Sequence, residues 1–288
     1  DEQAEGWRDV ADRVHEEGGT LFMQIMHGGR TSHPDLIDGA NPVAPSAFDW
    51  GGTVRGFAGK MDAPVPRELK KEELPRIVDE FRQGARRAID AGVDGVEIHG
   101  ANGYLLHEFM ASSANKREDE FGGSPENRWR LSEMVIRAVA EEIGADRVGV
   151  RFSPAHNVQG VIEDDQEDML ATYGGLLDAL APLNLAYVSL LHGEPASELT
   201  ATLAQKARAN GVTKVLMNDG FPTLTSKEDA QREIELDYVD AAVVGRQLIA
   251  NPDLVRRWRE GLELNEPDQD TFYLGGERGY IDYEYAAD

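Results

Sequence analysis

The stretch of sequence that decides the fold is Gly95-Val-Glu-Ile-His-Gly-Ala-Asn-Gly-Tyr-Leu-Leu-His-Glu-Phe109, where a mostly apolar run leads directly into a polar loop. A short run of this kind is typical of a strand buried on both faces of a parallel sheet. His99, Asn102 and Tyr104 follow at the carboxyl end of that strand. Two neutral hydrogen-bonding groups and a phenol placed together suit a site that polarises a carbonyl-like oxygen and supplies a proton.

These three side chains also admit a purely structural interpretation. His99 and Asn102 could satisfy backbone groups where the strand ends, and Tyr104 could belong to the core with its hydroxyl paired. A second polar stretch, residues 112–124, follows shortly afterwards along the chain. That density of polar groups favours a functional site.

Further short apolar runs resemble the one at residue 95, and segments with helical periodicity lie between them. This alternation predicts repeated βα units and a parallel sheet. The predicted strands are Leu21–His27, Gly95–His99, Arg147–Phe152, Ala186–Leu191, Lys214–Met217 and Ala241–Val244. The predicted helices are Asp1–Gly19, Glu72–Ala91, one that begins near Pro125, Asp165–Leu180, Ser197–Asn210, Ser226–Leu236 and Pro252–Gly261.

Two long loops follow strands, from His27 to about Lys70 and from Gly100 to Ser124, whereas the turns before strands are short. Enzymes built on parallel barrels carry their chemistry on loops at this end of the strands. The chain of 288 residues is close to the length of an α/β barrel, about 250 residues, so we expect one domain over residues 1–288, although two are possible. Six predicted strands are fewer than the eight of a (β/α)8 TIM barrel, so we expect missing N-terminal strands or an open sheet.

The composition limits the class of protein and its partners. A formal net charge of −24 argues against nucleic acid and anionic membranes as partners, because both repel an acidic surface. No apolar run approaches the roughly 20 residues needed to cross a bilayer. There are no cysteines, which excludes disulfides and thiolate-bound metals and fits a cytoplasmic protein. The spread of acidic residues favours either adaptation to high salt or simply a well-solvated surface.

Two glycine-containing turns follow the last two predicted strands. Asn218-Asp-Gly220 comes after the first of them, and Gly245-Arg246 comes directly after the second. Backbone amides in such turns, together with an arginine, make up the phosphate site that many barrels build after strands seven and eight. The alternative is that the glycines are ordinary turn residues and that Arg246 lies on the surface.

Two polar residues interrupt apolar strands. Arg151 ends its strand, and we expect it to contact either a ligand or a carboxylate in a structural ion pair. Gln24 lies inside another strand, where a buried amide must be hydrogen-bonded, either in an internal network or to a heteroaromatic ring. The histidines lack partners at metal-ligand spacing, so we predict no metal site.

Several ordered segments together resemble the Old Yellow Enzyme family of FMN-dependent ene-reductases, and the resemblance extends over essentially the whole chain. The matching segments are His27–Arg30, Pro42–Ser46, Gly95–Leu106, Phe121–Arg128, Arg151–Pro154, Gly245-Arg246 with Ala250–Asp253, and, at the C-terminal end, Tyr273 and Tyr280–Tyr285. The resemblance implies a (β/α)8 barrel that reduces the activated C=C bond of α,β-unsaturated carbonyl or nitro compounds as an NAD(P)H:flavin oxidoreductase.

The resemblance also implies a role for each residue of the strand-end group. His99 and Asn102 would hold the carbonyl or nitro oxygen of the alkene, while Tyr104 would donate a proton to its α-carbon. Reduced FMN would deliver hydride to the β-carbon. NADPH or NADH, with NADPH preferred, would reduce the flavin at the same site.

The remaining candidate residues match positions that bind the cofactor in the family. The resemblance implies that Gln24 binds the pyrimidine edge of the flavin and that Arg151 stands beside flavin N1. Gly220, Gly245 and Arg246 would receive the FMN phosphate.

The chain also departs from the family pattern. The family barrel opens with two strands ahead of the helix with which this chain begins, so we expect a truncated chain, a homo-oligomer or another polypeptide that supplies the missing strands. Asp219 stands where glycine is common in the family, and its charge would weaken the binding of FMN phosphate. The absence of cysteine removes the iron–sulfur branch of the family. The competing hypothesis is a non-catalytic or complementation-dependent barrel fragment that binds a partner chain or a ligand.

Overall fold

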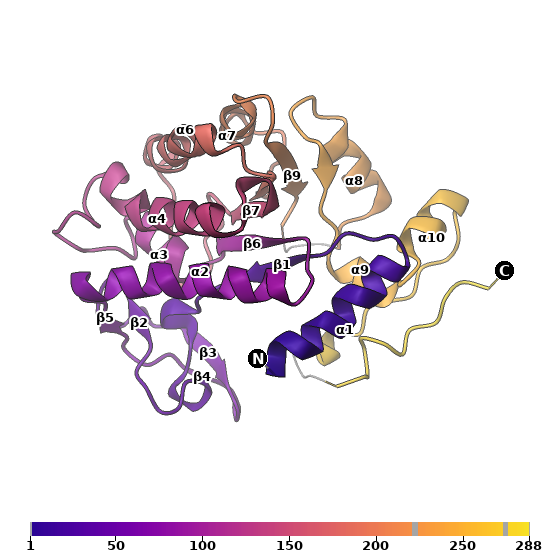
Figure 1. Ribbon diagram of the computed structural model, residues 1–288, viewed down its shortest axis with the longest axis horizontal. Coiled ribbons are helices and arrows are strands. Elements are labelled where there is room, and N and C mark those ends of the chain that lie inside the picture. The colour runs from indigo at the N-terminus through magenta and orange to yellow at the C-terminus, as the bar shows by residue number, and fades with distance from the viewer. Residues whose placement is uncertain (1, 221–223, 273–275, 288) are drawn as a thin grey trace.

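The centre of the molecule is a parallel sheet (Figure 1). The computed structural model describes residues 2–220, 224–272 and 276–287, so Asp1 and Tyr273 of the sequence predictions lie outside the described residues. The strands follow the order β1-β6-β7-β8-β9-β10 across the sheet. Their bounds are β1 (Phe22–Ile25), β6 (Gly95–Gly100), β7 (Val148–Phe152), β8 (Tyr187–Leu191), β9 (Lys214–Asn218) and β10 (Ala241–Ala242). Every predicted strand is therefore present, with β1 and β10 shorter than expected.

Helices connect the strands, and α2 and α4 lie side by side on one face of the sheet (Figure 1). The helices are α1 (Glu2–Glu16), α2 (Leu74–Asp90), α3 (Leu105–Met110), α4 (Pro125–Ile143), α5 (Gln166–Met169), α6 (Gly175–Leu180), α7 (Glu198–Arg208), α8 (Lys227–Ile234), α9 (Arg246–Ala250) and α10 (Leu254–Glu260). A π-helical turn over Leu170–Gly174 joins α5 to α6. The short helices α3 and α9 were not predicted.

Side chains alternate between the two faces of each central strand. Val96 and Ile98 of β6 are fully buried against the helices, as is Val150 of β7. On the opposite face, His99 lies next to Arg151 in the parallel register, and Arg151 lies next to Ser189 of β8. One face of the sheet therefore builds the hydrophobic core, and the other carries polar groups.

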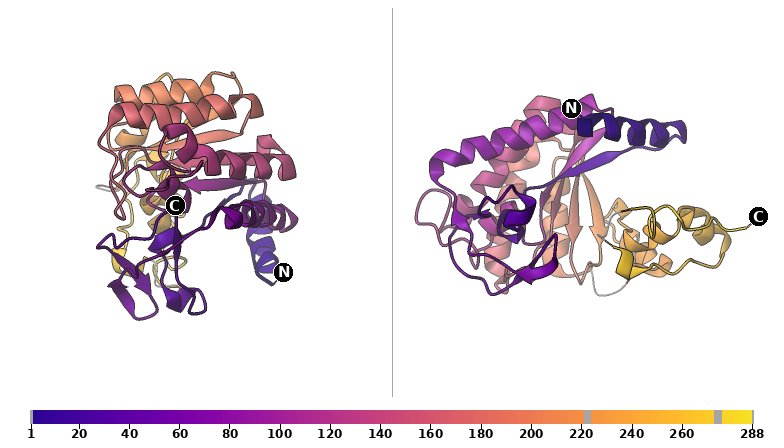
Figure 2. Two further views of the ribbon diagram at one scale, coloured as in Figure 1. Left: turned by 90° about the vertical axis from the view of Figure 1, so that its left-hand side faces the viewer. Right: turned by 90° about the horizontal axis from the view of Figure 1, so that it is seen from below.

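The long loop predicted between His27 and Lys70 contains secondary structure of its own. β2 (Val43–Ala44) pairs in parallel with β5 (Arg67–Glu68), and β3 (Thr53–Gly56) forms an antiparallel hairpin with β4 (Gly59–Asp62). These strands lie on the opposite side of the molecule from the segment that follows β10 (Figures 1 and 2). The loop is therefore an ordered layer beside the sheet.

The sheet is open. Within the described residues, β1 and β10 each pair with one neighbouring strand and form the two edges. Gln24 is consequently exposed, and the prediction that its amide is buried was wrong. The physical reason is that Gln24 faces the open cavity and that β1, at the edge of the sheet, has a neighbouring strand on one side only.

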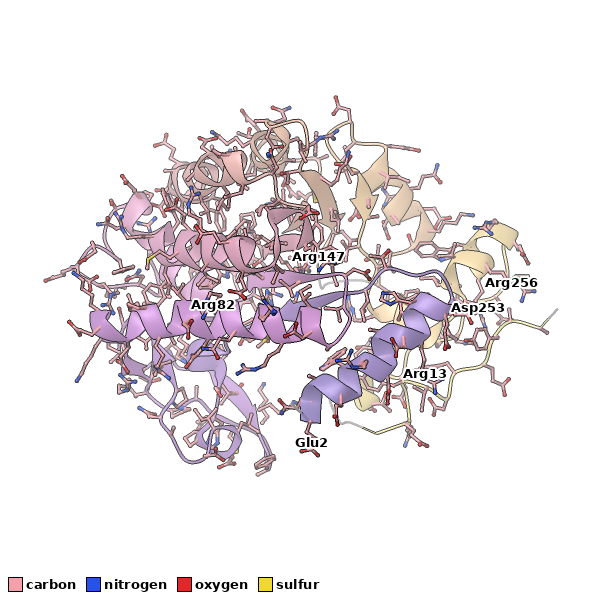
Figure 3. The ribbon with its side chains drawn as sticks, in the orientation of Figure 1. Glu2, Arg13, Arg82, Arg147, Asp253 and Arg256 are labelled. Carbon is pink, nitrogen blue, oxygen red and sulfur yellow. The ribbon has the colours of Figure 1, made fainter. Side chains whose placement is uncertain are left out.

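Charged side chains cover the outer surface of the helices. Arg82, labelled on α2 in Figure 3, donates through Nη2 to Asp79 at 2.6 Å and through Nη1 to Glu142 of α4 at 2.7 Å. These pairs are only partly buried, so solvent screens them and each contributes little to stability. No helix among the described residues has the length and apolar character needed to span a membrane.

The start of α4 is held by a buried arginine. Arg128 is 3% exposed, and its Nε donates to Met110 O at 2.8 Å. Its Nη1 donates to Gly123 O at 2.6 Å, and its Nη2 reaches both carboxylate oxygens of Asp168 at 2.6 and 2.7 Å. One side chain thus joins α3, the polar loop, α4 and α5.

We expect Arg128→Ala to lower the free energy of unfolding by about 3 kcal/mol, because the substitution leaves Asp168 and the buried carbonyl group of Met110 without their partner. Urea denaturation measures the change. Arg76→Ala serves as the control, since Arg76 forms an exposed pair with Glu80, and its removal should cost less than about 1 kcal/mol. Equal losses of unfolding free energy in the two variants would contradict the structural role assigned to Arg128.

Candidate active site

A cavity of about 860 Å³ opens on the polar face of the sheet, at the carboxyl ends of the strands. It is lined by residues from β1, β6, β7, β8, β9 and the turns that follow β9 and β10. All the predicted site residues except Tyr104 line it, namely Gln24, His99, Asn102, Arg151, Gly220, Gly245 and Arg246. Residues from distant parts of the sequence thus meet in one place.

His99 is 4% exposed, and its Nδ1 atom is buried without a hydrogen-bond partner. Burial lowers the pKa of His99 from its usual 6.5 to about 3, and the nearby charge of Arg151 acts in the same direction. The imidazole is therefore neutral at physiological pH. It can take part in a hydrogen bond to a ligand without carrying a charge.

Tyr104 lies directly beside His99, although it does not line the cavity. The two ring centroids are 5.0 Å apart in an edge-on arrangement. Tyr104 is also the residue that precedes the first turn of α3, so the position of this short helix determines where the phenol lies. The structure thus brings the three predicted catalytic residues together, while their roles stay predictions.

Asn102 adopts a left-handed backbone conformation with φ of 56°. Asparagine tolerates this region better than most residues, because its short polar side chain can hydrogen-bond locally. Asn102 lines the cavity. Its side-chain Oδ1 is buried and lacks a hydrogen-bond partner. A buried polar atom without a partner is costly, so a hydrogen-bond donor of a ligand is the natural partner for Asn102 Oδ1.

Sequence reasoning missed Glu97, which lines the cavity in the middle of β6. It accepts a hydrogen bond from Gln24 Nε2 at 2.6 Å, and its charge raises the pKa of the Tyr187 hydroxyl, which burial has already raised. The same charge opposes the lowering of the Arg151 pKa by burial. The signal was present in the sequence as an acidic residue within an apolar strand. Glu97 therefore links two of the predicted cofactor residues.

Arg151 and Gln24 both have protein partners on this face. Arg151 Nη1 donates to Ser189 Oγ at 3.1 Å, and Gln24 donates to Glu97 as described. The sequence left open whether each residue serves a network or a ligand. Both residues line the cavity while keeping these contacts. The hydrogen bonds to Ser189 and Glu97 therefore orient the Arg151 and Gln24 side chains that face the cavity.

The turns after β9 and β10 form the other end of the cavity. Asn218 Nδ2 donates to Val243 O at 2.8 Å and so holds the two strand ends together. Gly220 has φ of 97°, which a residue with a side chain rarely adopts. Asp219 lines a different cavity and accepts a hydrogen bond from Thr225 Oγ1 at 2.9 Å. Thr225 also lines the main cavity, so the effect of the Asp219 charge on phosphate binding stays a prediction.

The described part of the chain contains no group of three or more His, Asp or Glu residues arranged to hold a metal ion. The candidate site combines uncharged hydrogen-bonding groups near His99, the carboxylate of Glu97 and the cationic groups of Arg151 and Arg246.

Comparison with known proteins identifies relatives over nearly the whole chain. A model of the NADH:flavin oxidoreductase / NADH oxidase family matches residues 1–265. The chain is 40% identical over 291 residues to a probable flavin mononucleotide-dependent alkene reductase of Leishmania infantum, which covers 99% of this chain and 77% of that protein.

Solved structures extend the similarity to three dimensions. Morphinone reductase in complex with tetrahydroNAD has a TM-score of 0.88 at 37% identity, over 99% of this chain and 78% of that one. The old yellow enzyme homologue of Zymomonas mobilis has a TM-score of 0.88 at 34% identity, over 98% of this chain and 78% of that one. These neighbours confirm the predicted fold class, a (β/α)8 barrel of which the described residues supply six strands. The chain therefore belongs to the NADH:flavin oxidoreductase / NADH oxidase family, as its resemblance to the Old Yellow Enzymes predicted.

Proposed function

We propose that this chain is an FMN-dependent ene-reductase that uses NAD(P)H to reduce the activated C=C bond of small α,β-unsaturated carbonyl or nitro compounds. The observation that carries the proposal is the meeting of His99, Asn102 and Tyr104 beside a cavity that also holds the predicted FMN residues. Membership of the NADH:flavin oxidoreductase family supports it at the level of reaction class.

The cavity fits FMN in size and in the chemistry of its lining. Its volume of about 860 Å³ lies within the range of small-molecule and cofactor pockets, roughly 300–1,000 Å³. Arg246, with the amides of the Gly220 and Gly245 turns, suits a phosphate, whereas Arg151 and Gln24 suit an electron-rich ring with donor and acceptor groups. Bound FMN supplies hydride transfer.

The residues beside the cavity then act on the alkene. Neutral His99 and the Nδ2 group of Asn102 donate hydrogen bonds to the carbonyl or nitro oxygen of the substrate. Because these groups are fixed before the substrate arrives, they stabilise the negative charge that develops on that oxygen. The Tyr104 phenol, next to His99, donates the proton to the α-carbon.

The remaining predictions complete the proposal. Residues 1–288 form a single barrel domain that acts in the cytoplasm on a small molecule, with no nucleic acid or membrane as partner. The open edges at β1 and β10 support a second copy or another chain that adds strands there. A non-catalytic fragment is not favoured, because the relatives that match over 99% of the chain include a reductase.

The proposed activity requires the protein to bind FMN and to oxidise NAD(P)H in the presence of cyclohexenone or a maleimide. We expect Tyr104→Phe to slow reduction of the alkene by about 100-fold or more, because the proton donor is lost. Flavin absorbance under anaerobic conditions follows the two half-reactions separately, and the oxidation of NAD(P)H should be little changed.

Tyr238→Phe is the matched control, since the Tyr238 hydroxyl donates to Pro195 O and Tyr238 does not line the cavity. A wild-type protein without flavin absorbance and without NAD(P)H oxidation would refute the function. An equal slowing of both half-reactions by Tyr104→Phe would refute the proton-donor role alone.

Removal of the predicted phosphate ligand provides a separate test of cofactor binding. We expect Arg246→Ala to raise the dissociation constant of FMN by about tenfold or more, because a charge-assisted hydrogen bond to the phosphate is lost. Quenching of flavin fluorescence measures this constant. Arg259→Ala, at an exposed position of α10, should bind FMN like the wild type. Unchanged affinity in Arg246→Ala would exclude Arg246 from the phosphate site.

The depressed pKa of His99 predicts how stability depends on pH. Between pH 6.5 and about 3 the unfolded chain binds a proton at His99 that the folded chain does not. The free energy of unfolding should therefore fall as the pH drops through this window, by at most about 1.4 kcal/mol per pH unit from this group. His99→Asn removes the contribution, so urea denaturation should show a shallower pH dependence. Identical dependences in the two proteins would contradict the burial of a neutral His99.

A further inference from the structure

Three hydrogen bonds hold the backbone around Asn102. The Asn102 N–H donates to Ser153 Oγ at 2.8 Å, and Gln159 Nε2 donates to Asn102 O at 2.7 Å. The next N–H, that of Gly103, donates to His107 Nδ1 at 2.9 Å. Ser153 and His107 are fully buried. Both peptide groups that flank the Asn102 side chain are thus fixed by side chains from other segments.

Gln159 is itself held in place. Its backbone also has a positive φ, of 55°, and its carbonyl oxygen accepts a hydrogen bond from Arg30 Nη2 at 3.2 Å. Arg30 is 1% exposed, with its guanidinium 5.4 Å from the ring centroid of Phe48 and 5.2 Å from that of Trp50. The ordered layer beside the sheet therefore determines where the Gln159 amide lies.

His107 belongs to a buried cluster beneath the same loop. Since its Nδ1 accepts from the Gly103 N–H, the proton of the neutral ring lies on Nε2. Nε2 is 3.2 Å from Glu163 Oε2, an electrostatic contact whose geometry is not that of a hydrogen bond. Glu163 also accepts from Tyr173 Oη at 2.9 Å and from the Ala155 N–H at 3.1 Å. The cluster thus fixes the ring that binds Gly103.

The two loops approach each other closely at Gly103. A Cβ atom built there would lie 2.8 Å from Gln159 Cβ and 2.9 Å from Val158 O. No side chain fits at these distances, so the backbone of residues 102–103 packs directly on the backbone of residues 158–159.

We propose that Gln159 and the His107–Glu163 pair are positioning residues that hold Asn102 in its left-handed conformation and keep its amide directed into the cavity. None of the three lines the cavity, so they act through Asn102 and not on a ligand. The inference rests on the proposed function, because it assigns the Asn102 amide to the binding of the substrate or nicotinamide oxygen.

Gln159→Glu tests the first part of the proposal. The change keeps the shape of the side chain and replaces the donor to Asn102 O by a carboxylate oxygen, which repels it. We expect the dissociation constant of tetrahydroNAD and the KM for cyclohexenone to rise by about tenfold, while the dissociation constant of FMN changes by less than about twofold. The amides of Asn102 and Gly103 should exchange hydrogen about tenfold faster.

Gln205→Glu is the matched control, because Gln205 is exposed on α7 and the substitution is the same. Unchanged hydrogen exchange in β7 and an unchanged melting temperature would show that Gln159→Glu still folds normally. If Gln159→Glu resembles Gln205→Glu both in hydrogen exchange and in the binding of tetrahydroNAD, the proposal is wrong.

A double-mutant cycle separates positioning from a general structural effect. In an Asn102→Ala background, Gln159→Glu should change the binding of tetrahydroNAD by less than about twofold, because the group that it positions is gone. An undiminished effect in that background would overturn the proposal.

Glu163→Gln tests the second part, with Glu167→Gln at an exposed position of α5 as its control. We expect faster hydrogen exchange at Gly103 in Glu163→Gln alone, and equal exchange in the two variants would remove the His107–Glu163 pair from the proposal. The exchange measurements need no bound flavin. A wild-type protein that fails to oxidise NAD(P)H would therefore refute the proposed function without deciding how Asn102 is held.

Discussion

The alternation of side chains along the central strands is the constraint on which the rest of the structure depends. In β6, Ile98 enters the core beneath the helices, and its neighbours Glu97 and His99 face the cavity. A shift of one residue in the pairing would exchange these two faces, placing a carboxylate and an imidazole among the apolar side chains of α2 and α4. The same hydrophobic burial that stabilises the sheet therefore fixes the register between His99 and Arg151.

The larger elements of the fold could be predicted from the sequence, because strands buried on both faces appear as apolar runs and long amphipathic helices separate them. The smaller elements could not. The β3–β4 hairpin ends in an exposed turn with Phe57 at its tip, and α3 and α9 are too short to show a helical period. The prediction for Gln24 failed for a different reason: burial of a strand residue depends on a neighbouring strand, which the run of apolar residues does not reveal.

Some residues of the candidate site could likewise be predicted from the sequence, and others could not. Residues at the ends of strands, such as His99 and Arg246, were found because the fold class places those ends together. The groups that orient them were missed, because they come from segments with no motif of their own. Gln159 lies 57 positions from Asn102 in the sequence, and Glu97 is a single charge within a strand. Only the folded chain shows that these side chains are neighbours.

The close packing at Gly103 also limits how the two loops can diverge. With Gln159 Cβ and Val158 O both within 3 Å of the space a side chain would occupy, neither segment can change its path without the other. A loop taken from a relative to replace residues 153–161 would have to bring the turn at residues 101–104 with it. Protein engineering therefore has to treat the two loops as one unit, although more than fifty residues of chain separate them.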